Sequence, residues 1–293
     1  MGRRTIGRAV SVAGIGLHGG QSVRVELRPA APGACRAFTQ AGRSPIPATL
    51  DRVCDAHLAT RLAGDGWTVR TVEHLLAAAF ALDIDDLEVE VIGDELPVLD
   101  GSAQGWLEAL DRAGLVDGAG RPDQFRVSAP VLVRDGDRWA RLEPHDGLDL
   151  HAEVCFDHPA VGHHRVHFDG TAAAFRRDIA PARTFGFAPD VAALRAAGLA
   201  RGGSLDNAVV FGDDGPLNPS GLRFPDEPAR HKMLDLCGDL ALLGARLRGR
   251  LTTTRPGHAL THALLRAAVK DGTRSGTEAG DFDPEAHLTS RVD

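Results

Sequence analysis

One short segment, residues 230–239 (RHKMLDLCGD), places an imidazole and two carboxylates at a regular four-residue spacing: His231, Asp235 and Asp239. Residues four apart lie on one face of an α-helix, so the three would form a polar stripe. Apolar residues occupy most of the other side, which is typical of an amphipathic helix. An imidazole and a carboxylate one turn apart can reach the same cation, and together they suit Zn(II).

A hydrolytic zinc site typically holds three protein ligands and keeps a fourth position open, so a third ligand is needed. The leading candidate is His74, and its neighbour Glu73 could act as a general base if both face one cleft. Plainer explanations exist for both patterns. A Glu in the first helical turn after a Thr71 cap is favoured by the helix dipole, and His-Asp pairs also occur on solvated helix faces. Spacing alone therefore indicates a candidate metallohydrolase.

The elements that would position these side chains fall into two halves of similar order, separated by the turn-rich stretch at residues 114–124. Each half has extended segments, a long helix with a His near its start, a strand and a second helix. The predicted helices lie at about 71–82, 102–114, 231–245 and 259–269. Packing the halves together could bring His74 and His231 into one site.

We therefore predict an α+β fold of two related units, residues 1–120 and 124–270, the second with an insertion at about 157–227. The tail at residues 271–293 is polar and lacks periodicity, so we expect it to be mobile.

The composition is that of an ordinary globular protein, with 43% hydrophobic and 25% charged residues among 293. No apolar run reaches the ~18 residues of a membrane span, and the first residues lack the pattern of a secretory signal, so we expect a cytoplasmic protein. The four Cys residues are scattered without a CxxC pair, which disfavours a disulfide framework or a thiolate zinc cluster. A net charge of −7 with interspersed signs argues against a general nucleic-acid binder.

Seven motifs resemble those of the UDP-3-O-acyl-N-acetylglucosamine deacetylases of lipid A biosynthesis, in the order of that family. They are GIGLHGG (14–20), TVEHLLAA (71–78), ELPVLDGSA (95–103), IAPARTFGF (179–187), GGSLDNAVV (202–210), GLRFPDEPARHKMLDLCGDL (221–240) and PGHAL (256–260). They cover nearly the whole chain up to about residue 270. The resemblance implies two units, each a small, mostly antiparallel sheet with two helices and one insertion, and an active site between the units.

The resemblance also implies the site residues. Zn(II), with Fe(II) as the alternative metal, would be held by His74, His231 and Asp235. The implied catalytic residues are Glu73 as general base, His258 as general acid, Thr184 as oxyanion donor, Lys232 as a cation near the developing charge, and Asp239 as the carboxylate that orients His258. The implied substrate contacts are Leu17, His18, Phe156, Asp157, Phe185, Val191, Ala200, Leu205 and Ala208. Without the resemblance, His258 would be a loop histidine and the apolar residues of the insertion would be ordinary packing.

The implied activity is zinc-dependent hydrolysis of the N-acetyl group of UDP-3-O-acyl-N-acetylglucosamine, the committed step of lipid A biosynthesis. The expected partner is this small acylated UDP-sugar, and we expect a monomer. Two other hypotheses are a non-catalytic nucleotide-sugar or acyl-lipid binding protein on the same scaffold, and a zinc hydrolase with another amide substrate. The first would need a lesion in the catalytic set, and the sequence has none. Acyl-chain length is left open.

Overall fold

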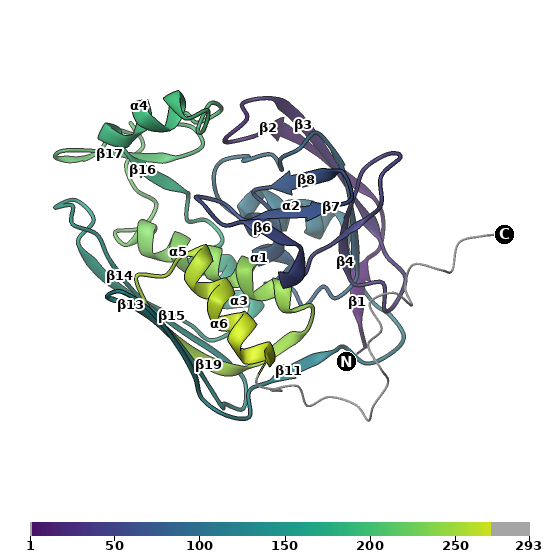
Figure 1. The fold of residues 1–293 in the computed structure, drawn as a ribbon. Helices are drawn as coiled ribbons and strands as arrows, with labels where there is room; N and C mark the ends of the chain where they lie inside the picture. Colours follow the sequence, from purple (N-terminus) through teal and green to yellow (C-terminus); the bar gives the residue numbers. More distant parts are fainter. Residues whose placement is uncertain (1, 271–293) are drawn as a thin grey trace.

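The structure is a computed structural model, and it describes residues 2–270. Figure 1 shows two β-sheets with helices between them, which confirms the predicted α+β class. Among these described residues no helix is both long enough and apolar enough to cross a bilayer. The tail predicted to be mobile lies outside the described residues.

The first sheet contains five strands in the spatial order β2-β3-β9-β4-β5. Their bounds are β2 (Val10–Ile15), β3 (Ser22–Pro29), β4 (Arg36–Thr39), β5 (Ile46–Pro47) and β9 (Leu87–Ile92). All neighbours are antiparallel except β4 and β9, which run parallel. Helix α1 (Glu73–Ala81) precedes β9, and helix α2 (Gln104–Ala113) follows it.

The second sheet has the spatial order β12-β13-β19-β14-β15, with a short strand, β11, added beside β19. The bounds are β11 (Gln124–Arg126), β12 (Val131–Asp135), β13 (Arg138–Glu143), β14 (Leu148–Cys155), β15 (His163–Phe168) and β19 (Arg246–Thr254). Helix α5 (Glu227–Leu240) precedes β19, and helix α6 (His258–Lys270) follows it. Apart from β11, only the neighbours β14 and β19 run parallel.

The two halves share one topology. When the five main strands of each sheet are numbered along the chain, both sheets have the order 1-2-5-3-4, with the parallel pair between strands three and five. Each half also has one helix before and one helix after its fifth strand. The predicted relation between the halves is therefore visible in strand order, although their residue identities are only weakly alike.

Each half also carries a small extra sheet before its central helix. The first is β6 (Val53–Asp55), β7 (Arg61–Gly64) and β8 (Trp67–Arg70), and the second is β16 (Phe185–Phe187), β17 (Val209–Gly212) and β18 (Gly215–Pro216), with helix α4 (Ala188–Ala196). Strand β15 lies inside the range expected to be an insertion, yet it pairs with β14 in the main sheet. The additional segment of the second half thus begins only after Phe168.

Short elements complete the described chain. Strand β1 (Arg4–Ile6) pairs with β10 (Leu115–Asp117), which ties the first residues to the end of the first half. The remaining elements are the helical turns η1 (Leu50–Arg52), α3 (Ala172–Ala174), η2 (Phe175–Ile179) and η3 (Ala241–Leu243).

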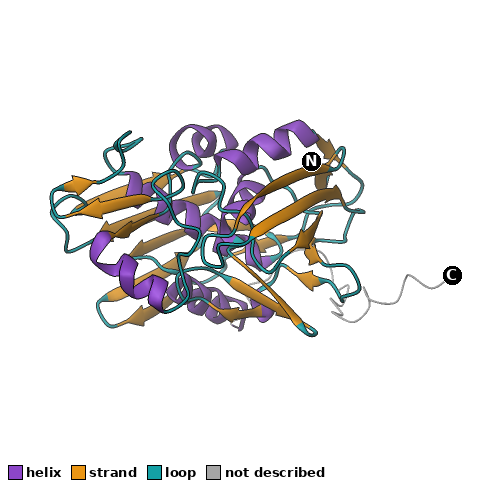
Figure 2. Cartoon of the chain, turned by 90° about the horizontal axis from the view of Figure 1, so that it is seen from above, coloured by secondary structure: helices purple, strands orange, loops and turns teal. Residues whose placement is uncertain are grey.

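Helices α1 and α5 pack against each other at the centre of the molecule, and Figure 2 shows strands on both sides of the central helices when the molecule is seen from above. Eight of the nine α1 residues are buried, as expected for a helix that is apolar on nearly all sides. On α5, Gly238 allows the closest approach, because a Cβ there would lie 2.2 Å from the carbonyl oxygen of Glu73. The missing side chain lets the start of α1 lie directly against α5.

The start of α1 differs from the expectation in one respect. Thr71 does not cap the helix: the N-cap is Val72, without a side-chain hydrogen bond. Thr71 instead has a left-handed backbone (φ 58°), and its hydroxyl donates to Glu95 at 2.9 Å. The same Glu95 carboxylate accepts the backbone N–H groups of His18 and Gly19. The expectation that Thr71 caps this helix is therefore wrong, although Glu73 does lie in the first turn.

Candidate active site

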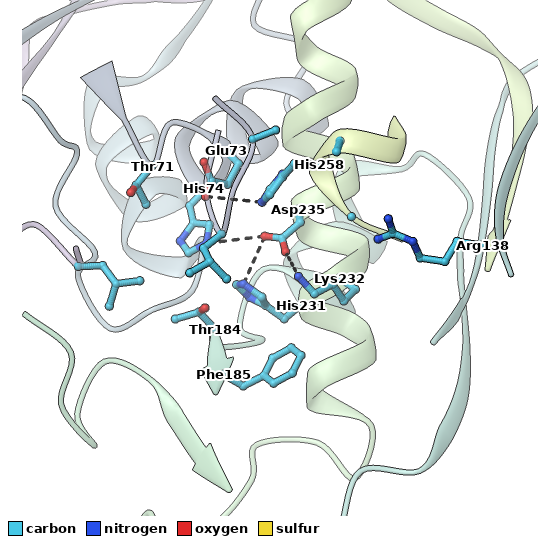
Figure 3. Close-up of a pocket in the computed structure, with 15 residues that line it drawn as sticks. Thr71, Glu73, His74, Arg138, Thr184, Phe185, His231, Lys232, Asp235 and His258 are labelled. Carbon is cyan, nitrogen blue, oxygen red and sulfur yellow. Dashed lines mark hydrogen bonds and ion pairs between the residues drawn. The ribbon is translucent and has the colours of Figure 1, made fainter. Parts of the chain in front are cut away.

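Two helices from different halves bring three ligand atoms together. His74 comes from the first turn of α1, and His231 and Asp235 come from successive turns of α5 (Figure 3). Oδ1 of Asp235 lies 3.3 Å from Nε2 of His231 and 3.9 Å from Nε2 of His74. One ligand atom from each residue lies within 4.8 Å of the others, and all three side chains are buried. The structure thus brings together His231 and Asp235, which the four-residue spacing placed on one helix face, and His74, which lies in the first turn of the long helix of the other half.

The protonation of this cluster fits a divalent cation. Burial, together with the neighbouring His231, lowers the pKa of His74 to about 3, and burial also lowers the pKa of His231. Nδ1 of His231 lies 3.0 Å from the carbonyl oxygen of Ala182, which directs its Nε2 lone pair toward Asp235. Nδ1 of His74 is buried without a hydrogen-bond partner in residues 2–270. Two neutral imidazoles facing one carboxylate are a suitable ligand set for Zn(II) or Fe(II).

Lys232 holds the other oxygen of the ligand carboxylate. Its Nζ donates to Oδ2 of Asp235 at 2.8 Å, which leaves Oδ1 turned toward the two imidazoles. Burial opposes ionisation of Asp235, but Lys232 and His231 outweigh it, so the pKa of Asp235 is well below its usual range. The carboxylate is therefore charged and oriented without an ion.

Glu73 and His258 face each other beside the cluster, with Oε1 of Glu73 4.0 Å from Nε2 of His258. Burial raises the pKa of Glu73 to about 7, and the backbone N–H of Thr60 donates to its Oε2 at 3.1 Å. Burial opposes the charge of His258, but the adjacent Asp239 carboxylate prevails and raises the pKa of His258 to about 9. Near neutral pH the site thus holds one residue able to accept a proton and one able to donate a proton.

Asp239 is the centre of a buried hydrogen-bond network. Its Oδ2 lies 2.8 Å from Nδ1 of His258, and its Oδ1 lies 3.0 Å from Nε2 of His262. The Thr60 hydroxyl donates to Oδ1 at 2.8 Å. Burial alone would raise the pKa of Asp239, yet the two histidines lower it well below its usual range. Asp239 is thus a buried anion, not part of a solvated helix face.

The cluster opens into a pocket of about 250 Å³, which Leu17, Thr184 and Phe185 also line. Thr184 is held at its edge because its backbone N–H donates to Gly101 at 2.7 Å. Gly101 has φ +86°, and a Cβ there would lie 2.0 Å from the carbonyl oxygen of Asn207. A side chain at position 101 would therefore clash with the backbone just before β17, where Val209 donates its N–H to the carbonyl oxygen of Thr184.

The sequence matches the LpxC family model, UDP-3-O-acyl N-acetylglycosamine deacetylase, over residues 3–270. This chain belongs to the LpxC family. It is 44% identical over 259 residues to the UDP-3-O-acyl-N-acetylglucosamine deacetylase of Anaeromyxobacter sp. (strain Fw109-5), covering 88% of this chain and 85% of that protein. The enzymes of the same name from a Nitratiruptor species and from Myxococcus xanthus are each 42% identical over 263 residues. These matches cover 89% of this chain and, respectively, 88% and 84% of the relatives.

In this LpxC-family chain only some of the expected substrate contacts line the pocket. Leu17 and Phe185 line it. Phe156 packs edge-on against Phe185, with ring centroids 5.2 Å apart, and the adjacent Asp157 is exposed. His18 is buried and is not among the residues that line the pocket.

The expected contacts in the second insertion lie around α4. Nδ1 of His18 accepts the backbone N–H of Ala200 at 3.5 Å, so the first-half turn meets this insertion. Leu205 is 40% exposed, while Val191 and Ala208 are half-buried. None of the nine α4 residues is buried. The apolar residues named here are therefore only partly covered by the rest of the described chain.

Several site residues were not predicted from the sequence. Thr60 contacts both Glu73 and Asp239, and Arg138 lines the pocket from the start of β13. His262 could have been noticed, because it follows His258 by four residues and so repeats the spacing of the α5 stripe. Thr60 and Arg138 have no comparable local signal.

Proposed function

We propose that this chain hydrolyses the N-acetyl group of UDP-3-O-acyl-N-acetylglucosamine with a Zn(II) ion held by His74, His231 and Asp235. The family membership supports the reaction and the substrate class. The observation that carries the residue assignment is the convergence of three buried ligand atoms beside a facing pair of buried proton-transfer groups. Fe(II) is the alternative ion, because two imidazoles and a carboxylate accommodate either metal.

The chemistry divides between the ion and the protein. When bound, the ion supplies Lewis acidity for an amide carbonyl, which is a poor electrophile, and for water, which is a poor nucleophile. Glu73 accepts the proton of the attacking water, and a pKa of about 7 suits a base that works near neutral pH. His258 donates a proton to the departing sugar nitrogen, giving acetate and the free amine. Asp239 keeps His258 protonated and fixes its ring through Nδ1.

Two further side chains stabilise the negative charge that develops on the amide oxygen. Lys232 provides a cation at the pocket wall, and Thr184 provides a hydroxyl at its edge. Each acts where charge grows during the reaction, and removing one such donor typically costs ~3 kcal/mol, or ~10²-fold in rate.

The substrate is proposed to lie across both halves of the chain, residues 1–120 and 124–270. Phe185 packs on the sugar, with Leu17 and His18 contributing the facing turn, and Phe156 and Asp157 contact the nucleotide. The 3-O-acyl chain follows the open apolar residues around α4, namely Val191, Ala200, Leu205 and Ala208. We also propose that the enzyme is a cytoplasmic monomer. The four Cys residues are free thiols, which fits a reducing compartment.

Metal analysis and turnover of matched variants test this proposal. His74→Ala should lose the bound ion, whereas Glu73→Gln should keep it and lose at least ~10²-fold in turnover of the acylated UDP-sugar. Glu108→Gln, on the exposed side of α2, is the control and should match the wild type. Full metal content in His74→Ala would remove it from the ligand set. Turnover of other N-acetyl sugars at a comparable rate would favour a different amide substrate.

A further inference from the structure

The second sheet presents a polar face away from the helices. Along β14, residues Leu150, Ala152 and Val154 point into the core, so the alternate residues Asp149, His151 and Glu153 lie on the opposite face. Figure 1 shows α5 and α6 on the core side of this sheet, and none of the described helices covers the other side. A hollow of about 730 Å³ lies on that outer face.

Two histidines on this face point at a single carboxylate oxygen. Nε2 of His167 lies 2.8 Å from Oδ1 of Asp149, and Nε2 of His151 lies 3.1 Å from the same atom. His151 and His167 are direct cross-strand partners of β14 and β15. Their rings are stacked, with centroids 4.6 Å apart and 23° between the planes. The antiparallel register and the two-residue spacing along β14 therefore place three ligand groups at one point.

We propose that Asp149, His151 and His167 form a second metal site, outside the active site, for a borderline divalent transition ion such as Zn(II). One ligand atom from each lies within 4.8 Å of the others. Ligand atoms at ~2.0–2.2 Å from a tetrahedral Zn(II) are separated by ~3.3 Å, somewhat more than the N···O distances of 2.8 and 3.1 Å in the structure. A small displacement of the side chains would admit the ion, with each neutral ring carrying its proton on Nδ1.

Neighbouring groups prepare the carboxylate for this role. Nε of Arg250 donates to Oδ2 of Asp149 at 2.6 Å, which turns Oδ1 toward the two rings. Burial opposes ionisation of Asp149, but Arg250 and the two histidines together prevail and lower the pKa of Asp149 well below its usual range. His145 lies on the Arg250 side, with its Nε2 3.9 Å from Oδ2. Water in the adjoining hollow can complete the coordination.

The site is distinct from the deacetylase centre. None of its three residues lines the active-site pocket, and none belongs to the catalytic set proposed above. An ion there would link β14 to β15 across the hairpin, so it would add a cross-strand connection to the second sheet.

Zinc uptake by the whole enzyme tests the site. Enzyme that already holds its active-site ion is dialysed against buffered Zn(II) at near-neutral pH, and its metal content is measured. The wild type should hold about one equivalent more than His167→Gln or His151→Gln, because each variant removes one of three ligands. All three proteins should retain wild-type deacetylase activity, which confirms that they are folded.

His163→Gln is the matched control, since His163 lies on the same face and pairs with Glu153 at 2.7 Å. It should take up as much Zn(II) as the wild type. Equal uptake by the wild type and His167→Gln would overturn the proposal. Equal loss in His163→Gln would also overturn it, because binding would then belong to the histidine-rich surface as a whole. The comparison between variants does not depend on which ion occupies the active site.

Discussion

Nδ1 of His258 lies 2.8 Å from Oδ2 of Asp239, and both side chains are buried. His258 is the first residue of α6, where both burial and the helix dipole disfavour a positive charge. The pKa of His258 is nevertheless raised to about 9, because Asp239 lies directly against the ring. This one carboxylate therefore sets whether the site contains an acid at neutral pH.

Asp239→Asn should move the basic limb of the pH profile. With a raised pKa, His258 is protonated below about pH 9, and the activity that needs this acid should fall as pH rises through that value. Without the carboxylate charge, burial dominates and the pKa of His258 falls. The basic limb of kcat/KM should then move down by at least about one pH unit. Asp213→Asn, on the surface, is the control, and an unmoved limb in Asp239→Asn would contradict the assignment.

His262 should act as a positioning residue through Asp239. Its Nε2 lies 3.0 Å from Oδ1, so His262→Leu would remove one hydrogen bond from a buried anion, typically ~1.5–3 kcal/mol. We expect kcat to fall roughly 10-fold with little change in KM, and the basic limb of the pH profile to shift. His262→Asn can still donate and should recover part of the loss. Equal kinetics for the Leu and Asn variants would indicate that His262 acts only by packing and that its hydrogen bond to Asp239 does not matter for turnover.

The buried pair of Arg183 and Glu227 should be a major source of stability. Glu227 accepts both Nε and Nη2 of Arg183, at 2.8 and 3.1 Å, and is completely buried. Glu227→Gln would leave the guanidinium uncompensated, so we expect a loss of ~3–5 kcal/mol and a Tm lower by roughly 10 °C. Asp111→Asn breaks an exposed bidentate pair with Arg176 and should cost at most ~1 kcal/mol. Similar melting curves for the two variants would contradict this ranking.

Gly238→Ala should separate the two central helices. An added Cβ would lie 2.2 Å from the carbonyl oxygen of Glu73 and 2.8 Å from its Cα, and neither backbone atom can move alone. We expect ~2–3 kcal/mol of destabilisation, despite the helix propensity of Ala, and a drop in kcat because Glu73 shifts. Calorimetry and turnover measure the two effects. Gly147→Ala, where no atom lies within 4 Å, should be nearly neutral, and full activity in Gly238→Ala would refute the close contact.

Local periodicity was enough to predict the elements that carry the site. The four-residue spacing of His231, Asp235 and Asp239 indicated one helix face, and the order of elements indicated two similar α+β halves. These features depend on residues close together in sequence, where helix and strand geometry determine which side chains share a face. The ligand pair of α5 and the candidate third ligand His74 could therefore be named from the residues themselves.

Only the tertiary structure decided the contacts between distant segments. Thr60 meets Asp239 across 179 positions of the chain, and the left-handed backbone of Thr71 depends on Glu95 and its surroundings. Neither contact has a periodic signal, because each arises from how separate elements pack and not from the geometry of one element. The same holds for the pKa of Glu73, which burial between two helices raises to about 7 although its position in α1 is an ordinary one for an acid. The sequence thus determined which groups are available, and packing determined their distances, their burial and hence their charge.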